Sequence, residues 1–382
     1  LNWPHDPFVI PNEILSAWRA AGGRGAETRE DWAERLIKSD KRAEFQRAVA
    51  GDLPDGWENA VISAKRGFSE DAPKLATRAS SGKTLDQITQ AVPEMIGGSA
   101  DLTGSNNTKA ADFGALAPPD YAGRYMYYGV REHGMAAAMN GMALHGGVIP
   151  YSGTFLIFSD YLRPSFRLAA LMGVRAIHVL THDSIGLGED GPTHQPVEHL
   201  ASLRAMPNVQ VFRPADAVEV AECWQLALEK KDGPSVLALT RQGLPTVRTE
   251  HTDENLSARG GYVLAEAEGD RQATILATGS EVEIALVARE SLQADGVPTA
   301  VVSLPCWELF AARDDAYRAE VLGNGVRVAV EAAIGFGWEQ WTGPDGGFVG
   351  MKSFGASAPA DQLYEHFGIT ADAVTAAVKK RL

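Results

Sequence analysis

Cysteine, long apolar runs and excess basic charge are all scarce in this chain of 382 residues, and each shortage excludes a class of protein. Only Cys223 and Cys306 are present, far apart in the sequence, so we expect neither a disulfide framework nor a cysteine-based metal site, and we expect a reducing cytoplasm. No apolar run approaches the length that spans a bilayer, and no membrane partner is expected. The formal net charge of −14 argues against nonspecific binding to nucleic acid.

Repeats, low-complexity tracts and a leader pattern are also missing. The chain opens on Leu1 rather than Met, and its first residues lack the basic-then-apolar pattern of a signal peptide, so we expect that it begins inside a longer protein. The length and the ordinary globular composition, 45% hydrophobic and 22% charged, predict about two domains.

Apolar periodicity divides the chain into three parts. Helix-like spacing over residues 1–75 predicts a helical connector. Short apolar runs at 174–180, 209–212 and 236–239 alternate with helical patterns and predict a parallel α/β domain over 76–245. After a polar stretch, 244–258, that is typical of a linker, runs at 273–276, 299–303 and 326–330 and a helix from Glu281 predict a second α/β domain over 246–382. The expected fold is therefore two consecutive parallel or mostly parallel α/β domains.

Two short motifs have ordinary structural explanations. The turn Thr278-Gly279-Ser280 resembles a phosphate-binding turn at a helix N-terminus, but Ser280 and Glu283 have the spacing of a capping box, which accounts for the pattern without a ligand. Asn106 and Asn107 fit either turn formers or polar contacts and decide nothing alone.

The polar segment 181–196 follows a predicted buried strand, where loops of parallel sheets carry binding sites. It brings His182, Asp183, Asp190 and His194 to one rim. Histidines beside carboxylates serve as metal ligands, as acid–base groups or as hydrogen-bonded structural groups. Because the spacing matches no familiar zinc pattern, a role in substrate binding or proton transfer is favoured.

Glu132 and three aromatic residues mark a second candidate region. Glu132 opens a helix running to about His145, where the helix dipole favours a carboxylate, but the apolar residues downstream give such a charge no obvious partner. Phe155, Phe158 and Tyr161 have helical spacing, which is more typical of core packing than of a cofactor platform.

Taken together, four segments resemble the transketolase family, thiamine-diphosphate enzymes that move two-carbon ketol units between sugar phosphates. The matching segments are Gly98-Ser-Ala-Asp-Leu-Thr-Gly-Ser-Asn106, Tyr128-Gly-Val-Arg-Glu-His-Gly134, Thr154-Phe-Leu-Ile-Phe158 and the run from Thr181 to Pro196. The resemblance extends over nearly the whole chain and implies the family's pyrimidine-binding domain followed by its C-terminal domain.

The resemblance also implies roles for individual residues. Glu132 matches the glutamate that hydrogen-bonds the cofactor's aminopyrimidine ring, and with His194 it is the expected catalytic group. The other matches are to cofactor contacts at Asp101, Leu102, Phe155, Phe158 and Tyr161, to sugar-hydroxyl contacts at His182, Asp190 and His194, and to a substrate-phosphate clamp at Arg78, Ser105 and Arg241. Forked guanidinium donors suit a phosphate dianion.

The departure from the family is large. Its N-terminal domain holds the diphosphate through a Mg²⁺ or Ca²⁺ ion with a Gly-Asp-Gly motif, and this chain contains no Gly-Asp-Gly. We therefore expect no metal ligands here, an inactive chain that needs the N-terminal half, and assembly as a homodimer. Two alternatives stay open: the corresponding half of a deoxyxylulose-phosphate synthase or 2-oxo-acid dehydrogenase, or a non-catalytic interaction module.

Overall fold

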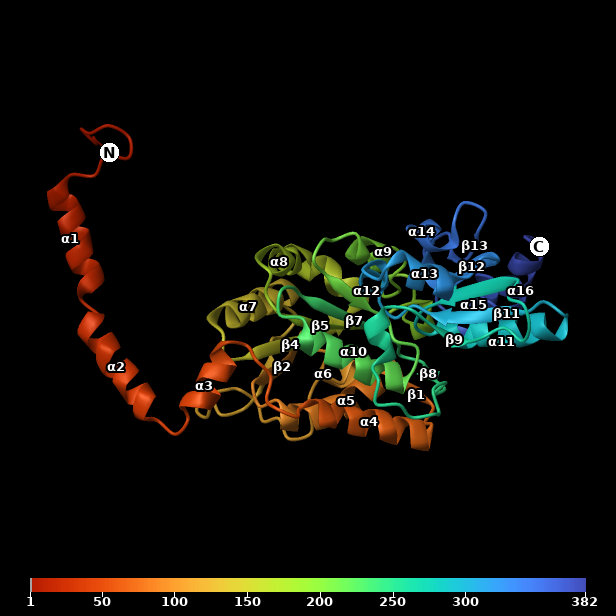
Figure 1. Cartoon of the computed structure of the whole chain (residues 1–382), viewed down its shortest axis with the longest axis horizontal. Coiled ribbons are helices and arrows are strands. Elements are labelled where there is room, and N and C mark those ends of the chain that lie inside the picture. Colours follow the sequence, from red (N-terminus) through yellow and green to blue (C-terminus); the bar gives the residue numbers. More distant parts are fainter. Residues whose placement is uncertain (1) are drawn as a thin grey trace. The chain divides into compact units, whose positions relative to one another are not determined.

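The computed structural model describes residues 2–382, and the chain separates into two compact units, one ending at Asp52 and the other running from Leu53 to Leu382. The N-terminal unit holds three helices, α1 (Asn12–Gly23), α2 (Ala26–Lys38) and α3 (Arg42–Val49), and none of them contains a buried residue (Figure 1). Helices are thus present where the spacing predicts them. The predicted boundaries at 75/76 and 245/246 remain a prediction.

A six-stranded sheet forms the first half of the larger unit. All of its neighbouring strands are parallel, and their order is β3-β2-β4-β5-β7-β6. The strands are β2 (Met95–Ser99), β3 (Tyr125–Tyr127), β4 (Ile149–Phe155), β5 (Ile177–Thr181), β6 (Gln210–Phe212) and β7 (Ser235–Leu239). The three apolar runs predicted as strands here are all found in the sheet.

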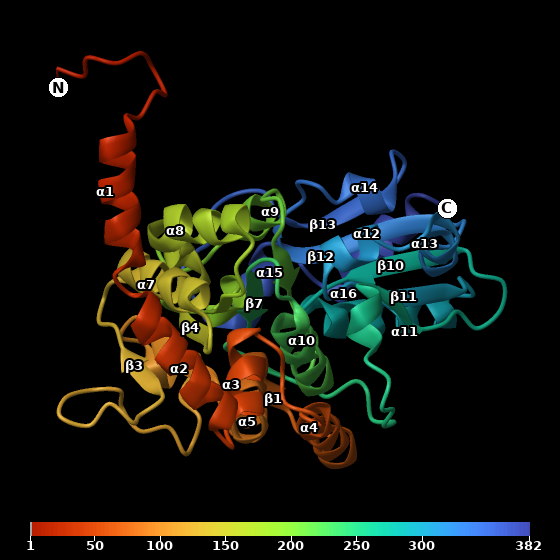
Figure 2. The ribbon, with the colours of Figure 1, turned by 60° about the vertical axis from the view of Figure 1, so that its left-hand side comes forward.

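Helices cover both faces of this sheet, which explains why its central strands β4, β5 and β7 are buried at every position. The helices are α4 (Glu58–Asp71), α5 (Thr77–Ala91), α6 (Thr103–Asn106), α7 (Glu132–His145), α8 (Ser159–Met172), α9 (His199–Arg204) and α10 (Ala217–Glu229). Figure 2 shows α7 and α8 on one side and α5 and α10 on the other. In β7, Leu237 joins the core under α10 while Val236 joins the core under α7 and α8, as the two-residue repeat of a strand requires.

A second sheet of five strands, ordered β13-β12-β10-β11-β9, forms the rest of the unit. Only β9 runs antiparallel to its neighbour, so the sheet is mostly parallel, as expected. The strands are β9 (Tyr262–Ala265), β10 (Ala273–Ala277), β11 (Thr299–Ser303), β12 (Val326–Ile334) and β13 (Gly347–Met351). The helices are α11 (Glu281–Ala294), α12 (Trp307–Ala311), α13 (Asp315–Leu322), α14 (Glu339–Thr342), α15 (Ala360–His366) and α16 (Ala371–Lys379).

The predicted linker contains more structure than its polar composition suggests. Gly243–Leu244 forms β8, which pairs with β1 (Leu75–Ala76), and Leu256–Arg259 forms a short 3₁₀ turn. Outside the linker, 3₁₀ turns also occur at Leu156–Phe158 and Ile185–Leu187. Arg248 is buried and its Nη1 lies 2.7 Å from Glu222 of α10, whose other oxygen pairs with the buried Lys65 of α4. These ion pairs hold the segment that connects the two sheets against α4 and α10.

The capping box predicted at Ser280 is wrong. Helix α11 begins at Glu281 as expected, but Ser280 has helical φ and ψ of −59° and −24°, and its side chain caps no backbone N–H. Its hydroxyl donates instead to the Glu281 carboxylate at 2.7 Å, within a buried polar cluster described below. No helix among residues 2–382 is both long and apolar enough to cross a membrane.

Candidate active site

The residues predicted to bind cofactor or substrate gather at the carboxyl ends of the first sheet's strands. Loops after β2, β3, β4, β5 and β7 carry them, and Arg78 lies in the first turn of α5. Parallel strands all end at one edge of their sheet, which is why segments so far apart in the sequence meet there. This edge is the only place where all of the matched segments converge among the elements that the structure describes.

Aromatic rings form one wall of the site. The rings of Phe155 and Phe158 are nearly parallel, 5.6 Å apart, and His182 stacks on Phe155 with centroids 3.7 Å apart. His194 meets Phe158 edge-on at 5.5 Å, and Tyr161 continues the series at 6.0 Å from Phe158. Phe155 is 7% exposed whereas Tyr161 is 64% exposed, so the wall runs from the core to the surface. The flat faces suit a planar ring.

Glu132 is the first residue of α7 and is buried, with 7% of its surface exposed. Thr154 of β4 donates to its Oε1 at 3.2 Å, and this is the one side-chain hydrogen bond that the carboxylate receives from residues 2–382. A buried carboxylate has capacity for several more donors. The group is therefore held in place by α7 and β4 and remains available to a ligand that offers N–H groups.

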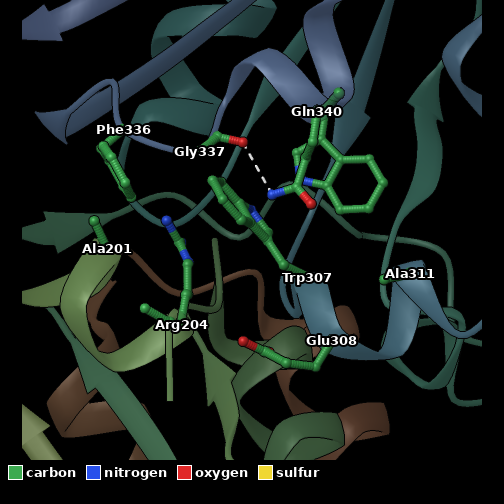
Figure 3. Close-up of a pocket in the computed structure, with 10 residues that line it drawn as sticks. Ala201, Arg204, Trp307, Glu308, Ala311, Phe336, Gly337 and Gln340 are labelled. Atoms are coloured by element: carbon green, nitrogen blue, oxygen red, sulfur yellow. Dashed lines mark hydrogen bonds between the residues drawn. The ribbon is translucent and has the colours of Figure 1, made fainter. Parts of the chain in front are cut away.

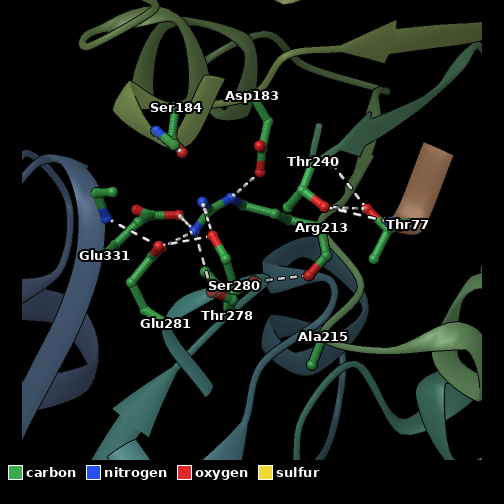
Figure 4. Close-up of polar contacts among 12 residues, drawn as sticks. Thr77, Asp183, Ser184, Arg213, Ala215, Thr240, Thr278, Ser280, Glu281 and Glu331 are labelled. Carbon is green, nitrogen blue, oxygen red and sulfur yellow. Dashed lines mark hydrogen bonds and ion pairs between the residues drawn. The ribbon is translucent and has the colours of Figure 1, made fainter. Parts of the chain in front are cut away.

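Two arginines lie beside the histidines without a carboxylate partner. Thr77 and Thr240 are buried and hydrogen-bonded to each other, with the Thr240 N–H donating to Thr77 Oγ1 at 2.7 Å (Figure 4), so the next residues, Arg78 and Arg241, are brought together. Arg78 donates to the carbonyl of Ser105 at 2.7 Å, and Arg241 donates to a loop carbonyl. Burial and the charge of Arg241 lower the pKa of Arg78. Two neighbouring cations without a carboxylate partner would be stabilised by a bound anion.

Electrostatics keep His182 neutral. Burial, followed by Arg78, Arg241 and His194, lowers the pKa of His182 to about 3. A neutral imidazole carries one donor and one acceptor, which suits contacts to sugar hydroxyls. The residue also has a left-handed backbone, with φ of 61°, an uncommon conformation for a side chain of this size.

A buried polar chain beneath the site explains how His182 is held. The Ser99 hydroxyl lies 2.9 Å from Asn106 Oδ1, the Asn106 amide donates to Thr181 Oγ1 at 2.7 Å, and that hydroxyl lies 2.9 Å from His182 Nδ1. Asn106 is fully buried. The sequence left its role open between turn former and polar contact, and the structure shows the polar contact. Its partners lie on β2 and β5, which are not adjacent in the sheet, so no local sequence signal gave this role.

Other predicted residues lie at the rim. Asp101 and Leu102 occupy the loop after β2, and Ser105 lies in α6. Asp101 is exposed with φ of 64°, and the Leu102 N–H donates to Ser99 Oγ. Asp190 is exposed and makes no hydrogen bond or ion pair with residues 2–382. The structure thus groups the aromatic wall, the histidines and the arginines, and leaves Asp101 and Asp190 at the margin.

A buried ionic cluster next to the site was not predicted. Arg213, which follows β6, contacts Asp183, Glu281 and Glu331, so it joins the loop after His182 to the second sheet (Figure 4). Arg204 binds Glu331 through two hydrogen bonds of 2.8 and 2.9 Å. Burial opposes ionisation of Glu331, but the two arginines outweigh it and lower the pKa of that carboxyl. This cluster of Arg204, Arg213, Asp183, Glu281 and Glu331 links the two sheets through buried ion pairs.

A cavity of about 270 Å³ lies next to this cluster, between α9 and the helices α12 and α14 (Figure 3). Arg204 stacks over the ring of Trp307 at 3.9 Å, and Ala201, Ala311 and Phe336 supply apolar surface. Because Glu331 already pairs with Arg204, this cavity offers a ligand mainly apolar contacts. None of the predicted site residues lines it.

Comparison with known proteins agrees with this geometry. The family model for the pyrimidine-binding domain of transketolase matches residues 73–246, and that for the transketolase-like C-terminal domain matches residues 260–370. The chain is 56% identical to a transketolase of Cereibacter sphaeroides and 58% identical to one of Rhodobacter capsulatus, in each case along its whole length. It spans 58% of the length of each of these relatives.

Solved structures give the same result. A transketolase from Leishmania mexicana, 39% identical, superposes with a TM-score of 0.90 over 99% of this chain and 55% of its own. A split-gene transketolase described as an inactive β4 tetramer is 28% identical, with a TM-score of 0.68, and the match covers 81% of this chain and 98% of that one. The chain belongs to the transketolase family and carries its pyrimidine-binding and C-terminal domains.

Proposed function

We propose that this chain supplies the pyrimidine-side wall of a transketolase that transfers a two-carbon ketol unit between sugar phosphates. The observation that carries the proposal is the meeting of a buried carboxylate, Glu132, an aromatic wall and two arginines without carboxylate partners at one sheet edge. The first two features suit an aminopyrimidine ring, and the third suits a phosphate group.

The residues present fit thiamine diphosphate at its pyrimidine end. Glu132 would accept from the aminopyrimidine, because its carboxylate is buried and receives a single side-chain hydrogen bond. Phe155 and Phe158 would cover a face of the ring. When bound, the cofactor supplies the carbon nucleophile that attacks a ketose. Its diphosphate and a divalent ion, Mg²⁺ or Ca²⁺, would be held by residues outside this chain.

The remaining side chains would bind and orient the sugar. Arg78 and Arg241 would hold its phosphate, with Ser105 beside them. His182 stacks on Phe155 and lies close enough to Arg78 and Arg241 for their charges to lower its pKa, while His194 meets Phe155 edge-on. Their ring nitrogens would contact the hydroxyl groups of the sugar, and His194 would move a proton. Asp190, Asp101, Leu102 and Tyr161 would complete the rim once further parts of the site enclose it.

A homodimer is the proposed assembly. Apolar side chains are exposed along α8 and at the end of α7, among them Leu144 at 60%, Leu168 at 48% and Leu171 at 72%. The inner face of α7 packs on its own sheet through Met135 and Met139, so the outer face is the surface left for a second copy. A strictly monomeric mass by light scattering at micromolar concentration would contradict this. A reducing cytoplasm is the proposed compartment, since both cysteines are free.

Complementation tests the function directly. The purified chain should show no ketol transfer, and calorimetry should show thiamine diphosphate binding weaker than micromolar, because stacking and one charged hydrogen bond together contribute only about 2–4.5 kcal/mol. Adding a separately produced N-terminal half of a close relative should restore transfer between a ketose phosphate and an aldose phosphate.

The control mixture contains the same N-terminal half and the Glu132→Gln chain, which should stay inactive. Transfer by the unmixed chain would overturn the expected dependence on the other half. Failure of a folded, binding mixture to transfer a ketol unit would overturn the proposed function. The split-gene relative described as inactive supports the first expectation.

A further inference from the structure

A second cavity, more polar than the first, lies at the amino ends of β10, β12 and β13, at the edge of the second sheet opposite to the one followed by Glu281. Its volume is about 590 Å³. We call it the amino-edge cavity; its lining includes Gln272, Gly325, Arg327, Asp345, Arg381 and Leu382. The function proposed above uses none of these residues.

Arg327 is a half-buried cation without a counter-charge. It is the second residue of β12, and its guanidinium donates to the carbonyls of Gly323 at 2.7 Å and Trp341 at 3.2 Å. It forms no ion pair within residues 2–382, and burial lowers its pKa. A desolvated cation bound only to neutral carbonyls is stabilised by an anion. The N–H groups that do not face these carbonyls remain free to bind one.

Arg381 adds a second guanidinium to the same cavity. Its Nη1 donates to the carbonyl of Ala377 at 2.8 Å, one turn earlier, and it has no carboxylate partner in the described part of the chain. Its guanidinium lies directly over the start of β13, where a Cβ on Gly347 would come within 2.7 Å of the Arg381 Cζ. The glycine therefore lets the arginine approach the strand ends closely.

Backbone N–H groups in the loops that line the cavity are further donors for an anion. The N–H groups of Asn324, Gly325 and Asp345 donate to no acceptor within residues 2–382. Gly325 has no room for a side chain, since a Cβ would lie 2.0 Å from the carbonyl oxygen of Gln272. Successive loop N–H groups next to arginines are a recurrent way of binding oxyanions. Asp345 is the carboxylate side chain at the rim of the cavity and opposes the arginines in charge.

We propose that the amino-edge cavity binds the phosphoryl group of a small phosphorylated metabolite, with Arg327 and Arg381 as its forked donors. Guanidinium forks match the geometry of phosphate oxygens. The cavity is within the range of small-molecule sites and has room for more than the phosphoryl group itself. This site is separate from Arg78 and Arg241, which lie at the first sheet.

The test uses the purified chain with Arg78→Gln and Arg241→Gln, so that the other arginine pair is silent. Calorimetry with glycerol 3-phosphate and with inorganic phosphate, at constant physiological ionic strength, should show saturable binding, tighter for the ester. Arg381→Gln should weaken binding by about tenfold or more, and Asp345→Asn should tighten it. Arg66→Gln, an exposed arginine of α4 that pairs with Asp253, is the matched control and should change nothing.

Arg327→Gln should weaken binding similarly, but this residue also holds Gly323 and Trp341, so the exposed Arg381 and Asp345 keep the test independent of folding. The absence of saturable binding to the silenced chain would overturn the proposal. So would binding that ignores both Arg381→Gln and Asp345→Asn. Equal affinity for the ester and the free ion would overturn the assignment to a metabolite. Loss of ketol transfer in the complemented enzyme bears only on the function proposed above.

Discussion

Arg213 Nε donates to Asp183 Oδ2 at 2.8 Å, and both side chains are fully buried. Asp183 directly follows His182 of the candidate active site, whereas the other partners of Arg213 belong to the C-terminal part of the chain, Glu281 at the start of α11 and Glu331 on β12. The pair therefore connects the edge of the first sheet that carries the candidate site to the C-terminal part of the chain. Removing Arg213 would leave the carboxylates of Asp183 and Glu281 buried without a cation.

Arg213→Gln should destabilise the larger unit by about 3–5 kcal/mol, because it leaves buried carboxylates unpaired. Urea denaturation followed by circular dichroism measures the loss. Arg318→Gln is the matched control, since Arg318 forms a surface pair with the exposed Asp315, and it should cost less than about 1 kcal/mol. A loss of the same size in both variants would show that the burial of the Arg213 cluster has no special effect.

Glu132→Gln should leave folding nearly unchanged and severely lower turnover in the complemented enzyme. The amide keeps the shape and can still accept from Thr154, but it lacks the negative charge that would favour protonation of the cofactor's ring. Steady-state kinetics and a denaturation curve on the same preparation separate the two effects. Wild-type turnover in this variant would show that the role proposed for Glu132 is wrong.

Arg241→Ala should weaken binding of phosphorylated substrates by about 1.5–3 kcal/mol, which corresponds to a rise in KM of roughly tenfold to a hundredfold. The reason is the loss of a charge-assisted hydrogen bond beside Arg78. The comparison substrate is a ketose without a phosphate, for which KM should hardly change. An equal rise for both substrates would place Arg241 outside the phosphate contact.

Contacts of Glu219 with the second sheet should make the stability of the larger unit depend on pH. Its carboxyl is fully buried and accepts from Tyr262 at 2.7 Å and Ser303 at 2.6 Å, both of the second sheet's strands. Burial, and then the neighbouring Asp216, raise the pKa of Glu219 to about 7. The native state thus retains a proton that the unfolded chain, with a pKa near 4.5, has lost.

This contribution to stability is complete below about pH 4.5 and is lost as the pH rises to about 7. The free energy of unfolding of the wild type relative to Glu219→Gln should therefore fall between pH 5 and pH 7 and then level off. Urea denaturation of both proteins across that range measures the difference. A constant difference, or one that grows with pH, would contradict the assignment.

Sequence reasoning succeeded where the signal is local. The run at 236–239 is apolar throughout and the run at 299–303 has an apolar centre, and both became strands, β7 and β11, that are buried at every position because helices cover both faces of their sheets. The motifs around Glu132, Phe155 and His182 were readable because each lies within one short segment. The order of strands in each sheet was out of reach, since pairing joins distant segments and follows no local pattern.

Ser280 shows how tertiary contacts override a local rule. Its spacing to Glu283 favours a cap, but its hydroxyl is drawn to Glu281 and lies near Arg213, a residue far away in the sequence. The same limit applies to Asn106, whose role follows from Thr181 on a strand that is not adjacent to it in the chain. Buried polar groups take their partners from the fold, so their roles appear only with the fold.

The helices α1–α3 contain no buried residue, although Trp18, Ile37 and Phe45 display apolar side chains. A helix of twelve or thirteen residues is marginal in water on its own. Amide hydrogens of α1 and α2 should therefore exchange with deuterium far faster than those of β5, which is buried throughout. If exchange in α1–α3 slows on mixing with an N-terminal half, the exchange rates of these amides would measure association of the two halves without any substrate.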